Sequence, residues 1–125
     1  MLLVDDEPDL GRLLEQHLVR AGQDVERCST GTEGIARLDA SPSIWAAAIV
    51  DLTLPDMSGT DVIARILALK PGLGIVVISG SPFDPAALHQ AYPDSPIRFL
   101  HKPFRMAELT AALAAVCKHP EQGAT

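Results

Sequence analysis

The stretch AAIVDLTLPDMSGTDVIARILAL at residues 47–69, followed by GIVVI at residues 74–78, indicates the fold class. Residues 47–50 and 74–78 are short and continuously apolar, as expected for parallel strands that are covered on both faces. The longer run at residues 59–69 is amphipathic and therefore favours a helix. A strand, a helix and a second strand in this order predict an α/β domain.

The same alternation of short apolar runs and longer amphipathic runs extends over the whole chain. We predict strands at Met1–Val4, Asp24–Cys28, Ala47–Val50, Gly74–Ile78 and Ile97–Leu100. We predict helices at about Asp9–Ala21, Thr32–Asp39, Gly59–Leu69, Pro85–Ala91 and Met106–Cys117. Right-handed crossovers between parallel strands give a doubly wound sheet, whose ligand site lies outside the carboxyl ends of the strands.

The composition restricts the class of protein. The 125 residues fit one compact domain, and 47% hydrophobic with 21% charged residues is typical of a soluble globular chain. A net charge of −6 argues against direct binding to nucleic acid, which needs a basic surface. No apolar run is long enough to span a membrane, and the N-terminus lacks a basic signal peptide. Cys28 and Cys117 form no metal-ligand pattern, so we expect a cytoplasmic protein with reduced cysteines.

Polar residues follow four of the five predicted strands. They are Asp5, Asp6 and Glu7 after the first strand, Asp51 after the third, Ser79 and Gly80 after the fourth, and Lys102 after the fifth. Three carboxylates at one edge of a sheet repel one another, and a divalent cation such as Mg²⁺ relieves this repulsion. A lysine, a hydroxyl and the backbone N–H groups of the Gly80 turn add hydrogen-bond donors beside them. Such groups suffice for phosphoryl transfer, which depends mainly on positioning and charge neutralisation.

Four stretches of the chain carry a family resemblance. LLVDDEP at residues 2–8, DLTLPDMSG at 51–59, ISG at 78–80 and FLHKPF at 99–104 resemble, in order and spacing, the motifs of response-regulator receiver domains of two-component signalling. Each motif alone is weak, but four in order over nearly the whole chain are specific. The resemblance implies a flavodoxin-like (βα)5 fold with strand order 2-1-3-4-5. We place the receiver domain at residues 1–118, and a tail or the start of a linker at 119–125.

The resemblance also implies roles for individual residues. Asp51 would be the phosphoacceptor. The Mg²⁺ (or Mn²⁺) ligands would be Asp5, mostly through water, Asp6, Asp51 and the backbone carbonyl of Thr53. Lys102 would contact a phosphoryl oxygen, as would the backbone of Thr53 and Gly80. Ser79 would turn towards the phosphoryl group, and Phe99 would rotate inward to fill the space that is vacated.

The function implied is that of a signalling switch rather than an enzyme. The phosphoryl group would come from the phosphohistidine of a histidine kinase or a histidine phosphotransfer protein. The switch would then regulate a partner, a fused kinase such as a hybrid sensor kinase, or a fused output domain, and a homodimer is one further option. Binding to nucleic acid or to a membrane is not expected.

Other interpretations of the same residues stay open. Singly, each polar residue has an ordinary explanation as a solvated loop or turn residue, and Phe99 fits an ordinary core position. A pseudo-receiver that binds partners without phosphorylation would normally lack Asp6, Asp51 or Lys102, which are all present. A Mg²⁺-dependent phosphohydrolase would carry a second aspartate where this chain has Thr53. A flavodoxin-like cofactor binder would need a phosphate-binding loop after the first strand.

Overall fold

The structure is a computed structural model that describes residues 1–40, 45–81 and 84–117. Its strands are β1 (Leu2–Val4), β2 (Glu26–Cys28), β3 (Ala47–Asp51), β4 (Gly74–Ser79) and β5 (Ile97–His101). Its helices are α1 (Pro8–Arg20), α2 (Gly31–Ala40), α3 (Gly59–Leu69), α4 (Pro85–Ala91) and α5 (Met106–Val116). The predicted tail at 119–125 and the domain boundary at residue 118 lie outside the described residues, so both stay predictions.

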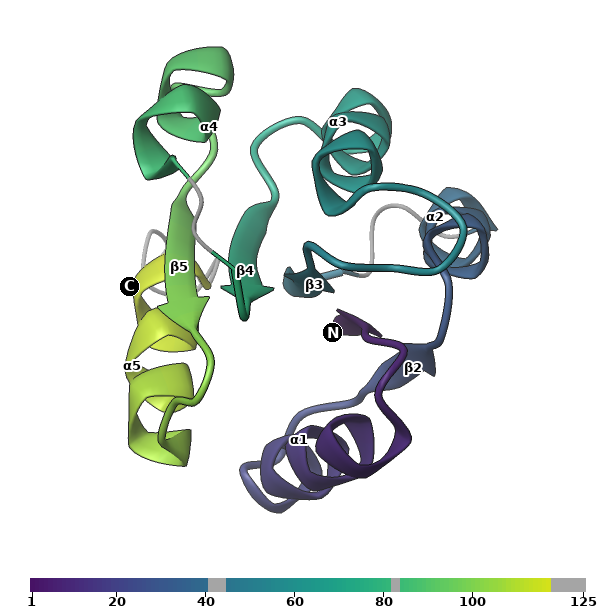
Figure 1. The fold of residues 1–125 in the computed structure, drawn as a ribbon, viewed down its shortest axis with the longest axis vertical. Helices are drawn as coiled ribbons and strands as arrows, with labels where there is room; N and C mark the ends of the chain where they lie inside the picture. The colour runs from purple at the N-terminus through teal and green to yellow at the C-terminus, as the bar shows by residue number, and fades with distance from the viewer. Residues whose placement is uncertain (41–44, 82–83, 118–125) are drawn as a thin grey trace, which may run out of the picture.

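The five strands form one parallel sheet in the order β2-β1-β3-β4-β5 (Figure 1). This arrangement confirms the predicted doubly wound sheet and its strand order. Strand β3 lies at the centre of the sheet, and all five of its residues are buried. A strand that is buried on both faces needs apolar side chains in succession, which explains the AAIV run.

The ends of several strands differ from the prediction by one or two residues. Asp51 pairs with Ile78, and Ser79 pairs with His101, so both Asp51 and Ser79 are the last residues of their strands rather than the first residues beyond them. At the other end, β2 begins at Glu26, whose backbone N–H donates to the carbonyl of Met1 at 2.9 Å. Asp51 and Ser79 are therefore held by the sheet itself.

Two separate hydrophobic cores cover the two faces of the sheet. Helices α2 and α3 pack on one face, where Leu88 of α4 and Tyr92 just after it are partly buried, and α1 and α5 pack on the other (Figure 1). Alternate residues of a strand serve the two cores: Ala48 and Val50 face α2 and α3, and Ile49 faces α1 and α5. Among the described residues, no helix has both the length and the apolar character needed to cross a membrane.

Helix α4 has the limits that the sequence predicts. Pro85 lies in its first turn, where proline is tolerated because the N–H has no helical partner. Asp84 caps the helix by accepting a hydrogen bond from the backbone of Ala86 at 3.0 Å. In α4, where every residue is described, no residue is fully buried. This helix therefore contributes the fewest buried residues of the five.

Candidate functional site

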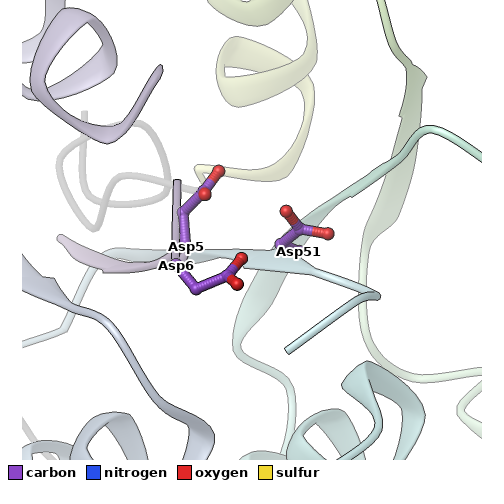
Figure 2. A group of neighbouring side chains, drawn as sticks. All are labelled: Asp5, Asp6 and Asp51. Atoms are coloured by element: carbon purple, nitrogen blue, oxygen red, sulfur yellow. The ribbon is translucent and has the colours of Figure 1, made fainter. Parts of the chain in front are cut away.

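Three carboxylates come together at the carboxyl edge of the sheet (Figure 2). Asp5 and Asp6 directly follow β1, and Asp51 ends the neighbouring strand β3. One oxygen from each of the three side chains lies within 4.8 Å of the others. Figure 2 shows the Asp6 carboxylate directed towards Asp51. The predicted gathering of these side chains is thus present, because the carboxyl ends of adjacent parallel strands share one edge.

The electrostatics of Asp5 fit a cation. Its Oδ1 accepts a hydrogen bond from the backbone N–H of Glu7 at 2.8 Å, whereas in the described part of the chain its Oδ2 is buried without a partner. Burial raises the pKa of Asp5 to about 6, the charge of Asp51 adds to the rise, and the bond from Glu7 opposes it. A hard divalent cation would satisfy the unpaired oxygen and relieve the repulsion, so the donor set fits Mg²⁺.

Asp51 is almost completely buried, with 2% of its surface exposed. Its Oδ2 accepts a hydrogen bond from Nζ of Lys102 at 2.9 Å, and its Oδ1 accepts one from the backbone N–H of Thr53 at 2.9 Å. A buried carboxylate needs such partners, because an unpaired charge in the interior is costly. The peptide bond between Lys102 and Pro103 is cis. The structure therefore brings the predicted acceptor and the predicted lysine into direct contact.

Lys102 has a second carboxylate partner, Glu7, whose Oε1 also accepts a hydrogen bond from Nζ. Burial lowers the pKa of Lys102, but the hydrogen bonds to Glu7 and Asp51 outweigh it and hold the pKa above its usual value. Sequence reasoning placed Glu7 in the run after the first strand and gave it no role. The sequence did contain a signal: Glu7 is the third acidic residue in a row after the first strand, and Lys102 follows the last strand at the same edge of the sheet.

The loop between β3 and α3 turns tightly beside Asp51. Ser58 caps α3 by accepting a hydrogen bond from the backbone of Asp61, and the N–H of Gly59 bonds to the carbonyl of Leu52 at 3.0 Å. A Cβ at Gly59 would lie 2.4 Å from Cα of Leu52, so only glycine allows this close approach. Thr53, which pairs with Ser58 in an isolated bridge, is held at the start of this turn.

Asp56 ties this loop to the beginning of α2. Its carboxylate accepts hydrogen bonds from the backbone N–H groups of Gly31 and Thr32, both at 2.9 Å, and from the Thr32 hydroxyl at 2.6 Å. The bonds from the hydroxyl and the backbone of Thr32, followed by the bond from Gly31, lower the pKa of Asp56 to about 2. Sequence reasoning missed this residue, because no local pattern says which helix a loop will meet.

Ser79 lies at the same edge, but its hydroxyl is engaged elsewhere. Oγ donates a hydrogen bond to the carbonyl of Ser81 at 2.9 Å and accepts one from the Ser81 N–H at 3.0 Å. The next residue, Gly80, is exposed, and a Cβ built on it would lie 3.8 Å from Cδ of Lys102. Both predicted residues therefore border Lys102, whose backbone N–H also donates to the carbonyl of Ser79 at 2.8 Å.

Phe99 lies on β5 and is half-buried against the core formed with α2 and α3. Its ring meets the ring of His89 edge to face, with centroids 5.4 Å apart and planes at 78°. His89 belongs to α4, and its Nε2 lies 3.1 Å from the carbonyl oxygen of Ile97. The ring of Phe99 therefore lies between β5 and α4.

Comparison with known proteins gives concordant results. The family model of the response regulator receiver domain matches residues 1–114. The C4-dicarboxylate transport transcriptional regulatory protein DctD of Rhizobium meliloti (strain 1021) is 35% identical over 104 residues, which are 83% of this chain and 22% of that protein. The response regulator receiver protein CpdR of Brucella abortus (strain 2308) is 31% identical over 113 residues, covering 87% of this chain and 88% of that protein.

Solved structures agree with the sequence relatives. A CheY-like response regulator receiver domain protein from Methanospirillum hungatei JF-1 matches with a TM-score of 0.79 and 25% identity, over 90% of this chain and 88% of that one. This chain spans well under two thirds of DctD and most of CpdR. The family match includes every strand of the sheet and all but the end of α5, and the chain therefore belongs to the receiver domains of two-component response regulators.

Proposed function

We propose that this chain is a phosphoacceptor receiver, which takes a phosphoryl group from a phosphohistidine onto Asp51 and changes conformation in response. The observation that carries the proposal is the 2.9 Å contact between Nζ of Lys102 and Oδ2 of Asp51, beside a cluster of three carboxylates. An anionic nucleophile and an anionic phosphoryl group approach each other only where positive charge compensates them. Lys102 supplies part of that charge at the nucleophile itself.

The remaining positive charge would come from Mg²⁺ or Mn²⁺. Asp5, Asp6 and Asp51 would hold the ion together with the backbone carbonyl of Thr53. The unpaired buried oxygen of Asp5 and its raised pKa support this assignment. When bound, the ion neutralises the carboxylates and the phosphoryl oxygens.

In the reaction, a carboxylate oxygen of Asp51 attacks the phosphorus in line with the leaving imidazole. The P–N bond of the phosphohistidine breaks, and its electron pair stays on the imidazole nitrogen. Lys102 then donates to a phosphoryl oxygen, and the backbone N–H groups of Thr53 and Gly80 are further donors. The product is an acyl phosphate on Asp51. Water can later cleave it along a path beside the Thr53 side chain.

Phosphorylation would bias a two-state switch. It adds a charge of about −1.5 to −2, by analogy with other phosphorylated residues. The Ser79 hydroxyl would leave Ser81 and donate to the phosphoryl group, and Phe99 would rotate inward. Support for this route comes from the contact of Phe99 with His89, which links the ring to α4, a helix with no buried residue. The protein thus promotes its own phosphorylation and dephosphorylation but acts as a signalling switch, not as an enzyme.

The partners follow from this chemistry. A phosphohistidine donor implies a histidine kinase or a histidine phosphotransfer protein in the cytoplasm. DctD, a transcriptional regulatory protein, is much longer than the matched region, which favours regulation of a fused output domain or a fused kinase. A homodimer remains a further option.

One experiment tests the acceptor. Wild type and Asp51→Asn are incubated with Mg²⁺ and a small acyl phosphate, and the intact mass of each is followed over time. We expect a single phosphoryl adduct on the wild type, none on Asp51→Asn, and none on the wild type when a chelator removes the metal. A folded, metal-bound wild type without an adduct would instead identify a pseudo-receiver, and rapid turnover of varied phosphate esters would identify a phosphohydrolase.

A further inference from the structure

Glu7 occupies the N-cap position of α1, but its side chain does not cap that helix. Its carboxylate accepts a hydrogen bond from Lys102, a residue 95 positions later in the chain. The Glu7 side chain is 53% exposed and the Lys102 side chain 21%, so the ion pair lies between solvent and the buried Asp51. The backbone N–H of Glu7 bonds to Asp5, which fixes the position of the residue independently of its side chain.

The ammonium group of Lys102 is therefore shared between two carboxylates. In the proposed reaction, a phosphoryl oxygen has to become a hydrogen-bond acceptor of this same ammonium. Glu7 competes for the group, and the exposed Glu7 charge also repels an anionic donor that approaches from solvent. Of the two carboxylates that hold Lys102, Asp51 has to stay in the site because it is the nucleophile. Only Glu7 can therefore give up its hydrogen bond to the ammonium group.

We propose that Glu7 is a positioning residue that restrains Lys102 and thereby limits the rate at which Asp51 captures a phosphoryl group. This inference rests on the proposed function. It concerns a residue outside the acidic cluster, which consists of Asp5, Asp6 and Asp51. Glu7 acts through Lys102 and does not need to touch the phosphoryl group.

Two substitutions separate the contact from the charge. Glu7→Asp keeps the negative charge on a side chain that is one methylene shorter, so the contact with Lys102 is lost. Glu7→Gln removes the charge and keeps an oxygen that can accept a weaker hydrogen bond. Asp9→Asn is the matched control, because it removes a charge two residues later on α1 from a side chain that pairs with Arg12 at 2.7 Å.

The rate of adduct formation is measured by intact mass over a range of acyl phosphate concentrations with saturating Mg²⁺. We expect Glu7→Asp to raise the maximal rate by about 3- to 10-fold without changing the half-saturating donor concentration. Glu7→Gln should raise the maximal rate and also lower the half-saturating concentration, and only the second effect should disappear at high ionic strength. Asp9→Asn should match the wild type. A maximal rate of Glu7→Asp equal to that of the wild type overturns the proposal.

A second measurement does not depend on phosphorylation. The urea midpoints of Glu7→Gln, Lys102→Met and the double variant are compared without metal, and contact between the two side chains predicts shifts that do not add. Additive shifts overturn the contact and with it the inference. A second outcome is non-additive shifts together with a wild type that forms no adduct. That combination overturns the proposed function and the kinetic role of Glu7 together, and leaves the contact as a structural ion pair. The two failures are thus distinguishable.

Discussion

Ser79 and Ser81 hold each other in a closed turn at the end of β4, through two hydrogen bonds that both use the Ser79 hydroxyl. Both partner atoms on Ser81 belong to its backbone, so its own hydroxyl is not needed for the turn. In the proposed switch the Ser79 hydroxyl has to leave this turn. The energetic barrier to switching therefore includes the loss of these two bonds.

A first prediction concerns this hydroxyl. Ser79→Ala should still accept a phosphoryl group on Asp51, but the aromatic resonances of Phe99 should shift less on phosphorylation than in the wild type. The reason is that alanine cannot donate to the phosphoryl group. Nuclear magnetic resonance spectra with and without phosphodonor check this. Ser81→Ala, which keeps both backbone groups, should behave like the wild type, and equal Phe99 shifts in all three proteins would falsify the coupling.

A second prediction concerns the ion pair in the site. Lys102→Ala should lower the free energy of unfolding by about 3 kcal/mol in the absence of metal, because it leaves the buried Asp51 carboxylate without its positive partner. Adding Asp51→Asn to this variant should recover much of the loss, because the uncompensated charge is then removed. Urea titration at neutral pH measures both changes. A double variant no more stable than Lys102→Ala would contradict the explanation.

A third prediction concerns the cation. Mg²⁺ at about 100 times its dissociation constant should stabilise the folded state by about 2.7 kcal/mol, because the ion binds only the folded site. The thermal midpoint should rise accordingly and return when a chelator is added. Asp6→Asn should lose most of the gain, whereas the exposed Asp94→Asn should keep it. Sodium chloride at the same ionic strength should not reproduce the effect, and if it does, the site is not specific for a divalent ion.

A fourth prediction concerns pH and Asp56. Its folded pKa of about 2 is below the ordinary value of 3.8, so its stabilising effect is complete above pH 3.8 and is lost as the pH falls through about 2. Asp56→Asn should therefore unfold at lower urea concentration than the wild type at pH 7, and this difference should shrink towards pH 2. Parallel urea titrations at several pH values test this. A difference that stays constant with pH would show that Asp56 stabilises by shape and not by charge.

The fold and the acidic cluster could be predicted from the sequence for one reason. The apolar runs before Asp5 and Asp51 predict parallel strands, whose carboxyl ends meet at one edge of the sheet, and the family resemblance implies that these two strands are neighbours. The same rule places Lys102 at this edge, but β4 lies between β3 and β5, so the contact of Lys102 with Asp51 was not predicted. Backbone periodicity thus determined which edge of the sheet carries these side chains, and their roles in phosphorylation remain predictions.

The remaining contacts depend on information that periodicity does not contain. The bond of Glu7 to Lys102 depends on the rotamers of two long side chains, and the bonds of Asp56 depend on where α2 begins relative to a distant loop. The Ser79 hydroxyl can rotate towards either neighbour, and the sequence does not say which it prefers. Such contacts are set by packing in three dimensions.

The unequal burial of the helices has a mechanical consequence. Helix α3 contributes five buried residues and α2 contributes four, while α4, described throughout, contributes none. Displacing α4 exposes the least apolar surface and so costs the least free energy. Movement of α4 is therefore the deformation that the domain resists least.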